Sequence, residues 1–400
     1  MRSNSATYSR VDVRTQLRLL RKAERSGEPF SDLLASAGWS YNDLCYTKSR
    51  KQTWNGRRPP SLDDLRLPGC HAQVVSFFTG CGGMDLGLEA AGFEHAAAFE
   101  INEVFCKTLR RNRPQWKVFG PPTHSGDVSK FDEISAVLAS VVGSPFGGLF
   151  VGGPPCQPFS IAANQRFAKS GENFKRIGFS HGENGNLLFD FVRLIAAFRP
   201  RAFVIENVPG LRDLDGGAQL RRTIDELRTI GYNVEEPFCL DAAHYYVPQQ
   251  RFRLFVVGSR SEGRFRGPAP SIGTYGSGSV LSRRIASLLN HETREHKAES
   301  ILRYMRLDYG QRDQLGRVDR LDPALPSKTV IAGGTNGGGR SHLHPEIPRT
   351  LSVRECARLQ TFPDDFEFVG ASARQFTQVG NAVPPVLAAQ LGRSILESYF

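Results

Sequence analysis

Apolar positions along most of the chain fall into short β-branched or aromatic runs, separated by segments with helical spacing. The runs predict strands at residues 74–78, 96–100, 149–151, 201–207 and 249–258. The spacing predicts helices at residues 84–93, 187–198 and 217–230. Two more are expected near the C-terminus: a capped helix with a turn within residues 349–366, and a closing helix that follows the glycine-asparagine turn at Asn381. Strands that alternate with helices indicate an α/β fold built on a Rossmann-like, doubly wound and mostly parallel sheet.

The first 72 residues do not follow this alternation. Residues 11–25 have helical periodicity with Val13, Leu17 and Leu20 on one face, and a second short helix is expected from Ser31. A basic segment punctuated by proline, TKSRKQTWNGRRPP, follows and is typical of a linker. Two readings stay open for this extension: a helix-turn-helix unit that regulates or contacts DNA, and a plain helical extension.

Regular patterning also fades between residues 259 and 344, where glycine, serine and arginine dominate. The segment is either a flexible surface domain with solvated charges or a domain that faces nucleic acid. We therefore expect an extension at 1–72 and a catalytic domain at 73–258, completed by a C-terminal helix at 376–400. A small, irregular recognition domain is expected at 259–375.

Composition indicates which cellular compartment and which kind of partner to expect. The 400 residues carry a formal net charge of +11, which favours a polyanionic partner such as nucleic acid. Seven cysteines without a Cys-x-x-Cys pair argue against a disulfide framework or a zinc ribbon. The N-terminus lacks the apolar core of a signal peptide, and no apolar run is long enough for a membrane span, so we expect a cytoplasmic protein with no membrane partner.

The first predicted strand leads directly into a glycine turn and a helix, the opening of a nucleoside-binding fold. The turn contains Gly80, Gly82 and Gly83, and it departs from the G-x-G-x-x-G spacing of a diphosphate cradle. Glu100 ends the second strand, where such folds grip a ribose diol, and Asp127 follows a third strand, where it can hold an adenine amino group.

A cysteine in a stiff turn is the strongest candidate for chemistry. In VGGPPCQPFS, Cys156 follows a buried strand and two prolines; a lone cysteine there is more often a small buried side chain. A later strand delivers Glu206 and Asn207 to the same sheet edge. Arg251 and Arg253 alternate with apolar residues and so face the same way. The long polar stretch at 161–186 is either a mobile functional lid or plain disorder.

Together, these motifs resemble the DNA (cytosine-5)-methyltransferases, a family typified by bacterial restriction–modification enzymes. The matching segments occur in the family's order over residues 73–400: FFTGCGGMDLGL, GGPPCQPFS, ENV, QQRFR, HPEIPRTLSVRECARLQTFPDDF and QVGNAVPP. The chain departs from the family where Ser76 replaces a frequent aspartate and Ile101 a frequent aromatic residue, and its segment after Ser160 is longer.

The resemblance implies a role for each matching residue. Cys156 would be the nucleophile, with Glu206, Arg251 and Arg253 as further catalytic residues, and S-adenosylmethionine would be the cofactor, leaving S-adenosylhomocysteine. Its pocket would comprise Phe78, Gly80, Gly82, Gly83, Glu100, Ile101, Asp127, Val128, Pro155, Leu187, Asn381 and Ala382. Substrate contacts would come from Gln157, Ser160, Asn207 and Arg340. No metal is expected, and the pair His342 and His344 belongs to a family motif.

The expected partner is double-stranded DNA from which a target cytosine is flipped. A cognate restriction endonuclease would be linked in function, and the protein would be a monomer. Two alternatives remain: a tRNA cytosine-5 methyltransferase, which shares most of these motifs, and a non-catalytic DNA-binding regulator on the same fold. The variable segment at 259–344 favours DNA, because a target-recognition domain belongs there.

Overall fold

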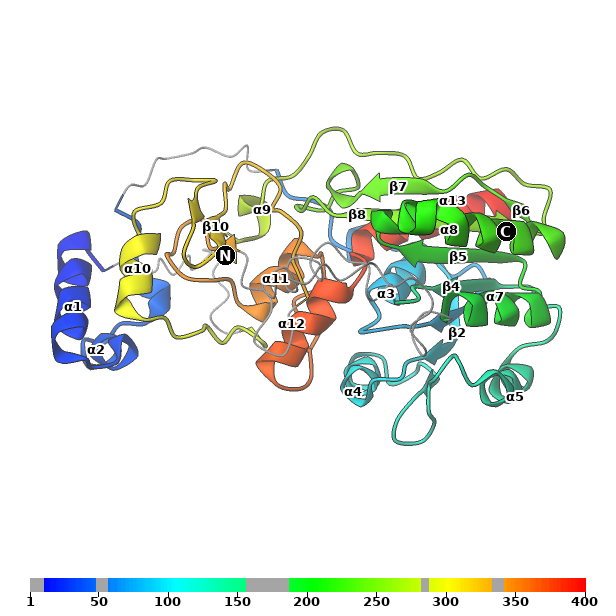
Figure 1. Cartoon of the computed structure of the whole chain (residues 1–400), viewed down its shortest axis with the longest axis horizontal. Coiled ribbons are helices and arrows are strands. Elements are labelled where there is room, and N and C mark those ends of the chain that lie inside the picture. The colour runs from blue at the N-terminus through cyan, green and yellow to red at the C-terminus, as the bar shows by residue number, and fades with distance from the viewer. Residues whose placement is uncertain (1–10, 48–56, 156–186, 282–287, 333–341) are drawn as a thin grey trace. The chain divides into compact units, whose positions relative to one another are not determined.

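The computed structural model describes residues 11–47, 57–155, 187–281, 288–332 and 342–400. The chain forms two compact units (Figure 1). One, here called the sheet unit, comprises Pro60–Tyr245, Arg251–Ile272 and Ala382–Phe400. The other, the mixed unit, comprises Met1–Pro59, Tyr246–Gln250 and Gly273–Asn381. Each unit is described by itself.

The sheet unit is built on one eight-stranded sheet in the order β3-β2-β1-β4-β5-β8-β6, with β7 also paired to β8. Strands β1 to β5 run parallel, whereas β8 is antiparallel to β5, β6 and β7. The strands are β1 (Gln73–Phe77), β2 (Glu94–Phe99), β3 (Val118–Phe119), β4 (Leu149–Gly152), β5 (Ala202–Asn207), β6 (Asn233–Val234), β7 (Phe238–Asp241) and β8 (Phe252–Ser259). The predicted doubly wound, mostly parallel fold is confirmed.

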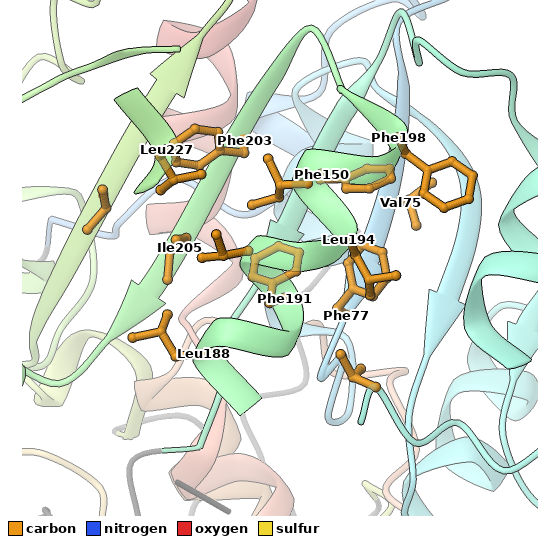
Figure 2. Close-up of a cluster of buried hydrophobic side chains, with 14 of the residues drawn as sticks. Val75, Phe77, Phe150, Leu188, Phe191, Leu194, Phe198, Phe203, Ile205 and Leu227 are labelled. Carbon is orange, nitrogen blue, oxygen red and sulfur yellow. The ribbon is translucent and has the colours of Figure 1, made fainter. Parts of the chain in front are cut away.

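Six helices belong to the described part of the sheet unit: α3 (Gly83–Ala90), α4 (Glu103–Asn112), α5 (Phe131–Val141), α7 (Leu187–Phe198), α8 (Ala218–Thr229) and α13 (Pro385–Tyr399). Consecutive residues of the central strands are buried, so the sheet is covered on both faces. On one face, side chains of α7 such as Phe191 and Leu194 pack on Phe77, Phe150 and the neighbouring strands (Figure 2). The core also takes residues from α5 and α8.

The C-terminal helix α13 completes this unit by packing against α3, the helix that follows the glycine turn. Two glycines permit the close approach. A Cβ on Gly87 would overlap the backbone at Pro385 and the side chain of Ala388, and one on Gly392 would lie 2.9 Å from Ala91 Cβ. The last residues of the chain therefore support the first helix of the sheet unit.

Within its described residues, the mixed unit combines helices with a small sheet. Its helices are α1 (Val13–Ser26), α2 (Phe30–Ser36), α9 (Gly278–Leu281), α10 (Ala298–Tyr304), α11 (Val353–Leu359) and α12 (Ser372–Asn381). A three-stranded sheet in the order β11-β10-β9 joins β9 (Arg312–Asp313), β10 (Val318–Arg320) and β11 (His342–Leu343). Ser352 caps α11 through a capping box with Glu355, so the capped helix expected within residues 349–366 is present.

The N-terminal segment shares the hydrophobic core of the mixed unit. Leu20 of α1, Phe30 of α2 and Tyr41 are buried in one cluster with Ile301 and Met305, at and just beyond α10. Gln16, fully buried on α1, donates to the Cys45 carbonyl (3.0 Å) and accepts from the Cys45 backbone N–H (2.8 Å). The amphipathic helix predicted at 11–25 therefore buries its apolar face against a segment about 280 residues later in the chain.

Polar contacts reinforce this docking. Tyr46 donates a hydrogen bond to the His344 carbonyl (2.8 Å). The guanidinium carbon of Arg320 lies 3.4 Å from the centre of the Tyr46 ring. Asn42 accepts from Arg349 Nε (2.9 Å), while the two terminal nitrogens of Arg349 each donate to a carboxylate oxygen of Glu355 at 2.8 Å. Burial alone would raise the pKa of Glu355, but the charge and hydrogen bonds of Arg349 hold it well below the usual value.

These contacts differ from the domain boundaries expected from the sequence. Residues 1–72 were expected as one extension and 259–375 as a separate domain. Instead, residues up to Pro59 cluster with Gly273–Asn381, whereas residues from Pro60 cluster with the sheet. Periodicity identifies the buried face of α1 but not the distant segment that covers it.

Truncating Leu20 tests whether α1 supports the mixed unit. Leu20→Ala should lower its free energy of unfolding by about 2–5 kcal/mol, because Leu20 is fully buried and the surrounding core relaxes only partly. The matched control is Leu315→Ala in the same unit, where the side chain is 77% exposed and the expected change is within about 0.5 kcal/mol. Thermal unfolding of the two variants would measure the difference, and equal transitions would contradict the structural role of α1.

Candidate active site

The carboxyl ends of the parallel strands gather the candidate residues at one edge of the sheet. The strand order β3-β2-β1-β4-β5 reverses between β1 and β4, and ligands in open α/β sheets bind at such a switch point. Phe78 follows β1, Glu100 follows β2, Gly153 follows β4, and Glu206 with Asn207 ends β5. The topology thus brings the predicted cofactor and catalytic residues to neighbouring positions.

The glycine turn after β1 has a backbone that needs glycine. Gly80 and Gly82 have φ of +62° and +84°. A Cβ on Gly82 would lie 2.8 Å from Leu109 Cδ2, whereas one on Gly80 would meet no atom within 4 Å. Gly82 therefore packs tightly on the protein, and open space lies in front of Gly80.

Behind this turn lies a buried polar cluster that the sequence analysis did not predict. His95 Nε2 lies 2.9 Å from Asp85 Oδ1, and the His95 ring stacks on Trp116 with 4.1 Å between centroids. Trp116 in turn donates to Glu89 Oε1 (3.2 Å) and faces Gly82. The cluster fixes the outer side of the turn, and its residues share no motif that would have revealed it.

Glu100 is held at the turn by backbone donors. Its carboxylate accepts from Gly80 N (2.7 Å) and from Asn102 N (2.8 Å), and its side chain is buried. Desolvation raises the pKa of Glu100 to about 7, against the lowering effect of these hydrogen bonds. Each carboxylate oxygen keeps acceptor capacity for a further donor. Next to it, Ile101 is 61% exposed and offers an apolar surface beside the acid.

Other residues assigned to the pocket lie on the same unit. A Cβ on Gly126 would overlap the Glu100 carbonyl oxygen, so the chain before Asp127 passes directly against Glu100. Asp127 Oδ1 accepts from the backbone and hydroxyl of Ser129 (3.0 and 2.7 Å). Val128 is part of the hydrophobic core, so its side chain is turned away from solvent.

Five pocket candidates remain. Phe78 has φ of +55° and meets Phe191 edge-on, with 6.2 Å between centroids. Leu187 and Ala382 are buried in the sheet unit, and Pro155 is exposed. Asn381 belongs to the mixed unit.

Glu206 and Arg253 form the centre of the catalytic candidates. Arg253 Nε donates to Glu206 Oε1 at 2.8 Å, and each side chain is 13% exposed. Burial raises the pKa of Glu206, and the charges of Arg253 and Arg251 offset part of that rise. Burial therefore favours the protonated form of Glu206, whereas the two arginines favour its carboxylate.

Arg251, the other arginine predicted to be catalytic, lies near this pair. It is fully buried, and its backbone N–H donates to Asp241 Oδ1 (3.0 Å). Burial and the neighbouring Arg253 lower the pKa of Arg251 well below its usual value, against the opposite effect of Glu206. Arg251 therefore supports Glu206 and Arg253 from inside the protein.

The turn that leads to the predicted nucleophile lies against Glu206. A Cβ on Gly153 would come within 2.9 Å of Glu206 Oε2, and Asn207 Nδ2 donates to the Pro154 carbonyl at 3.3 Å. The other end of the Asn207 amide accepts from Val208 N (2.7 Å), so this side chain, predicted to bind substrate, holds the turn. Cys156, Gln157, Ser160, the segment 161–186 and Arg340 lie outside the described residues.

Several arginines of the mixed unit serve its structure. Arg320 is buried and donates to the carbonyls of Pro345 and Leu307, while Arg303 and Arg312 pair with Asp313 and Asp319. Arg320 is therefore not a solvated charge, and the charges of Arg303 and Arg312 are paired within the unit. His342 and His344 are buried, with Nε2 3.1 Å from the backbone carbonyls of Lys328 and Leu281. No group of three or more possible metal ligands occurs in the described segments.

A family model described as C-5 cytosine-specific DNA methylase matches residues 72–397. The chain belongs to this family. Type II methyltransferases M.PspPI from Psychrobacter sp. (strain TA137) and M.NgoFVII from Neisseria gonorrhoeae are each 32% identical to it. The alignments cover 82% and 84% of this chain and 80% and 89% of theirs. M.Eco47II from Escherichia coli is 30% identical, over 84% of this chain and 81% of its own.

Solved structures agree with the methyltransferase fold. A candidate DNA modification methyltransferase encoded within an Escherichia coli prophage superposes with a TM-score of 0.65 at 23% identity, over 82% of this chain and 99% of that one. An Entamoeba histolytica methyltransferase superposes with a TM-score of 0.58 at 14% identity, over 82% of this chain and 98% of the other. Family membership rests on the sequence matches, and these structures support the fold.

The Gly153 contact yields a testable prediction for this cytosine-5 methylase. Gly153→Ala should lower the rate of methyl transfer by roughly 10²-fold, because the new Cβ pushes the Glu206 carboxylate or the turn out of position. Cofactor affinity, measured separately, should change little. Gly147→Ala is the control, because a Cβ there meets nothing within 4 Å; equal rates in the two variants would contradict the role of Gly153.

Proposed function

We propose that the protein methylates C5 of a cytosine within a recognised duplex DNA sequence, and that Cys156 is its nucleophile. The observation that carries this proposal is the Glu206–Arg253 pair, which lies against the turn leading into Cys156. Cytosine C5 is buried in the base stack, so the base must leave the duplex, at a cost of a few kcal/mol.

Cys156 activates the ring by covalent catalysis. Its thiolate adds to C6, which makes C5 nucleophilic, and the addition places negative charge toward N3. A thiol has an ordinary pKa of about 8.5, so positive charge nearby favours the reactive thiolate. After methyl transfer, loss of the C5 proton expels the thiolate and restores the aromatic ring.

Glu206 is suited to meet the charge that develops at N3. Burial raises its pKa, so its carboxyl group can share a proton with N3 as the thiolate adds. Arg253 holds one carboxylate oxygen through Nε, which leaves the other directed at Gly153 and the start of the Cys156 turn. Arg253 also keeps N–H groups for the exocyclic O2 of the base.

The residues around Glu100 fit S-adenosylmethionine, which supplies an electrophilic methyl group when it is bound. Glu100 has acceptor capacity for the two ribose hydroxyls, and open space faces Gly80. Ile101 and Phe78 provide apolar and aromatic surface for the adenine, and Asp127 an acceptor for its amino group. These residues bind and orient the cofactor and take no part in proton transfer.

The biological setting is proposed from the relatives. Their names as Type II methyltransferases favour a modification enzyme that acts with a cognate restriction endonuclease. We further propose that it is a cytoplasmic monomer. No helix within the described segments has the length and apolar character to span a membrane. The tRNA methyltransferase and the non-catalytic regulator remain the alternatives for the experiments below.

Cofactor binding should depend on pH through Glu100. Its pKa of about 7 means that the carboxylate accepts ribose hydroxyl hydrogen bonds above that pH and becomes protonated below it, so the dissociation constant of S-adenosylmethionine should rise as pH falls through 7. Glu100→Gln should weaken binding about 10- to 150-fold and flatten this pH dependence. Calorimetric titration measures both; Glu103→Gln, at an exposed residue paired with Lys107, is the control that should retain the wild-type profile.

Cys156→Ser should reduce methyl transfer by roughly 10³-fold or more, because a serine hydroxyl is a much weaker nucleophile toward C6. Binding of duplex DNA and of cofactor should persist. Transfer of labelled methyl groups to duplex DNA and to tRNA is the measurement, with DNA as the expected acceptor. Transfer to tRNA alone would support the tRNA alternative, and an inactive wild-type protein that binds DNA would support the regulator.

A further inference from the structure

Helix α1 carries a row of arginines on the face opposite its buried side. Arg14, Arg18, Arg21 and Arg25 are all exposed and follow the spacing i, i+4, i+7, i+11. At 3.6 residues per turn, the four side chains fall within about 60° of the helix circumference and span about 17 Å along its axis. The row is therefore one narrow, continuous basic stripe.

The charges of this row are not balanced within the described part of the chain. None of the four arginines has an acidic partner there within ion-pair distance, although Lys22 beside them pairs with Glu28. On α8, by contrast, Arg222 pairs with Glu226, and Arg228 pairs with Glu236. Like charges three and four residues apart repel one another, so a polyanion bound along the row would relieve that repulsion.

The row is also fixed in place. Gln16 and Leu20 on the opposite face are fully buried, and α1 packs on α10 of the mixed unit. Asp12 caps the start of the helix by accepting from the backbone of Arg14 and Thr15. Four guanidinium groups are thus displayed on a docked helix, which makes their binding less costly in entropy than binding by a free basic tail.

We propose that the α1 arginine row binds the phosphate backbone of the DNA substrate and adds a contact independent of base sequence. This inference rests on the proposed action on duplex DNA. Arginine forms charge-assisted hydrogen bonds with phosphate oxygens, and such contacts position a protein on the duplex without reading bases. The row would give a role in substrate binding to the N-terminal segment, which lies before the family match at residues 72–397.

The test is the salt dependence of DNA affinity in the full-length protein. The fourfold variant R14Q/R18Q/R21Q/R25Q should bind a long duplex more weakly and with a shallower salt dependence. Each lost phosphate contact should reduce the slope of log affinity against log salt by about 0.9, so the total reduction should be up to roughly 3.6. The fourfold lysine variant R14K/R18K/R21K/R25K should restore most of the slope, because a point charge suffices for phosphate neutralisation.

The matched control removes four positive charges from other helices. Lys107→Gln, Arg221→Gln, Arg222→Gln and Arg228→Gln change exposed residues of α4 and α8 that bond to other groups of the protein. This control should leave the slope nearly as in the wild type. The proposal would be overturned if the salt slope of the α1 variant differed from the wild type by less than the roughly 0.9 expected for one phosphate contact. It would also be overturned if the control variant changed the slope by as much as the α1 variant does. If the true partner of the row were an acidic protein, the slope for DNA binding would stay unchanged.

Two further measurements distinguish a loss of DNA contacts from unfolding and from a loss of catalysis. Thermal unfolding of the α1 variant should match the wild type, because all four side chains are exposed. At low salt the variant should still transfer labelled methyl groups to DNA, since the row is outside the active site. Loss of transfer in the wild type itself would refute the proposed function, whereas an unchanged salt slope in an active variant would refute only the role of α1.

Discussion

The antiparallel pairing of β8 with β5 is the constraint on which the active site depends. In this register Glu206 lies opposite Phe255, so Arg253 reaches the carboxyl end of β5 from the start of its own strand. A parallel strand would bring its other end to this edge. The single reversal in the central sheet thus supplies a cation to a buried carboxyl group, and the resulting balance leaves Glu206 with a raised pKa despite its arginine neighbour.

Glu206 and the next residue of β5 also position the turn that leads to the predicted nucleophile, Cys156. Glu206 fills the space where a side chain at position 153 would stand, and Asn207 on the same strand holds the Pro154 carbonyl. Two consecutive residues of β5 therefore position the turn, one by steric contact and one by a hydrogen bond. The prolines before Cys156 restrict the same backbone from within. Rigid positioning from several directions is what covalent catalysis on a flipped base requires.

The sequence predicted local structure well and distant contacts poorly. Helix α7 begins and ends at the predicted residues, because its apolar spacing and the following proline define both ends. The family motifs implied that Glu206 and Arg253 serve one site, and the structure shows the two side chains as an ion pair. Composition did not distinguish the buried Arg320 from exposed arginines, because only the fold shows that Tyr46 covers it. The segment against which α1 packs was not predicted, for a similar reason. Periodicity identifies the buried face of a helix but not the residues that cover it.

The arginines of this protein thus fall into two physical classes that net charge does not separate. Arg320 and Arg349 are buried, and hydrogen bonds to carbonyl and carboxylate oxygens offset the cost of removing them from water. The arginines on the outer face of α1 remain in solvent and form no ion pair with an acidic side chain in the described structure. Buried pairs of the first class dock the N-terminal segment on the mixed unit, and this docking gives the second class a defined orientation. The net charge of +11 can therefore attract a polyanion only through basic side chains that the fold leaves exposed and presents in a defined orientation.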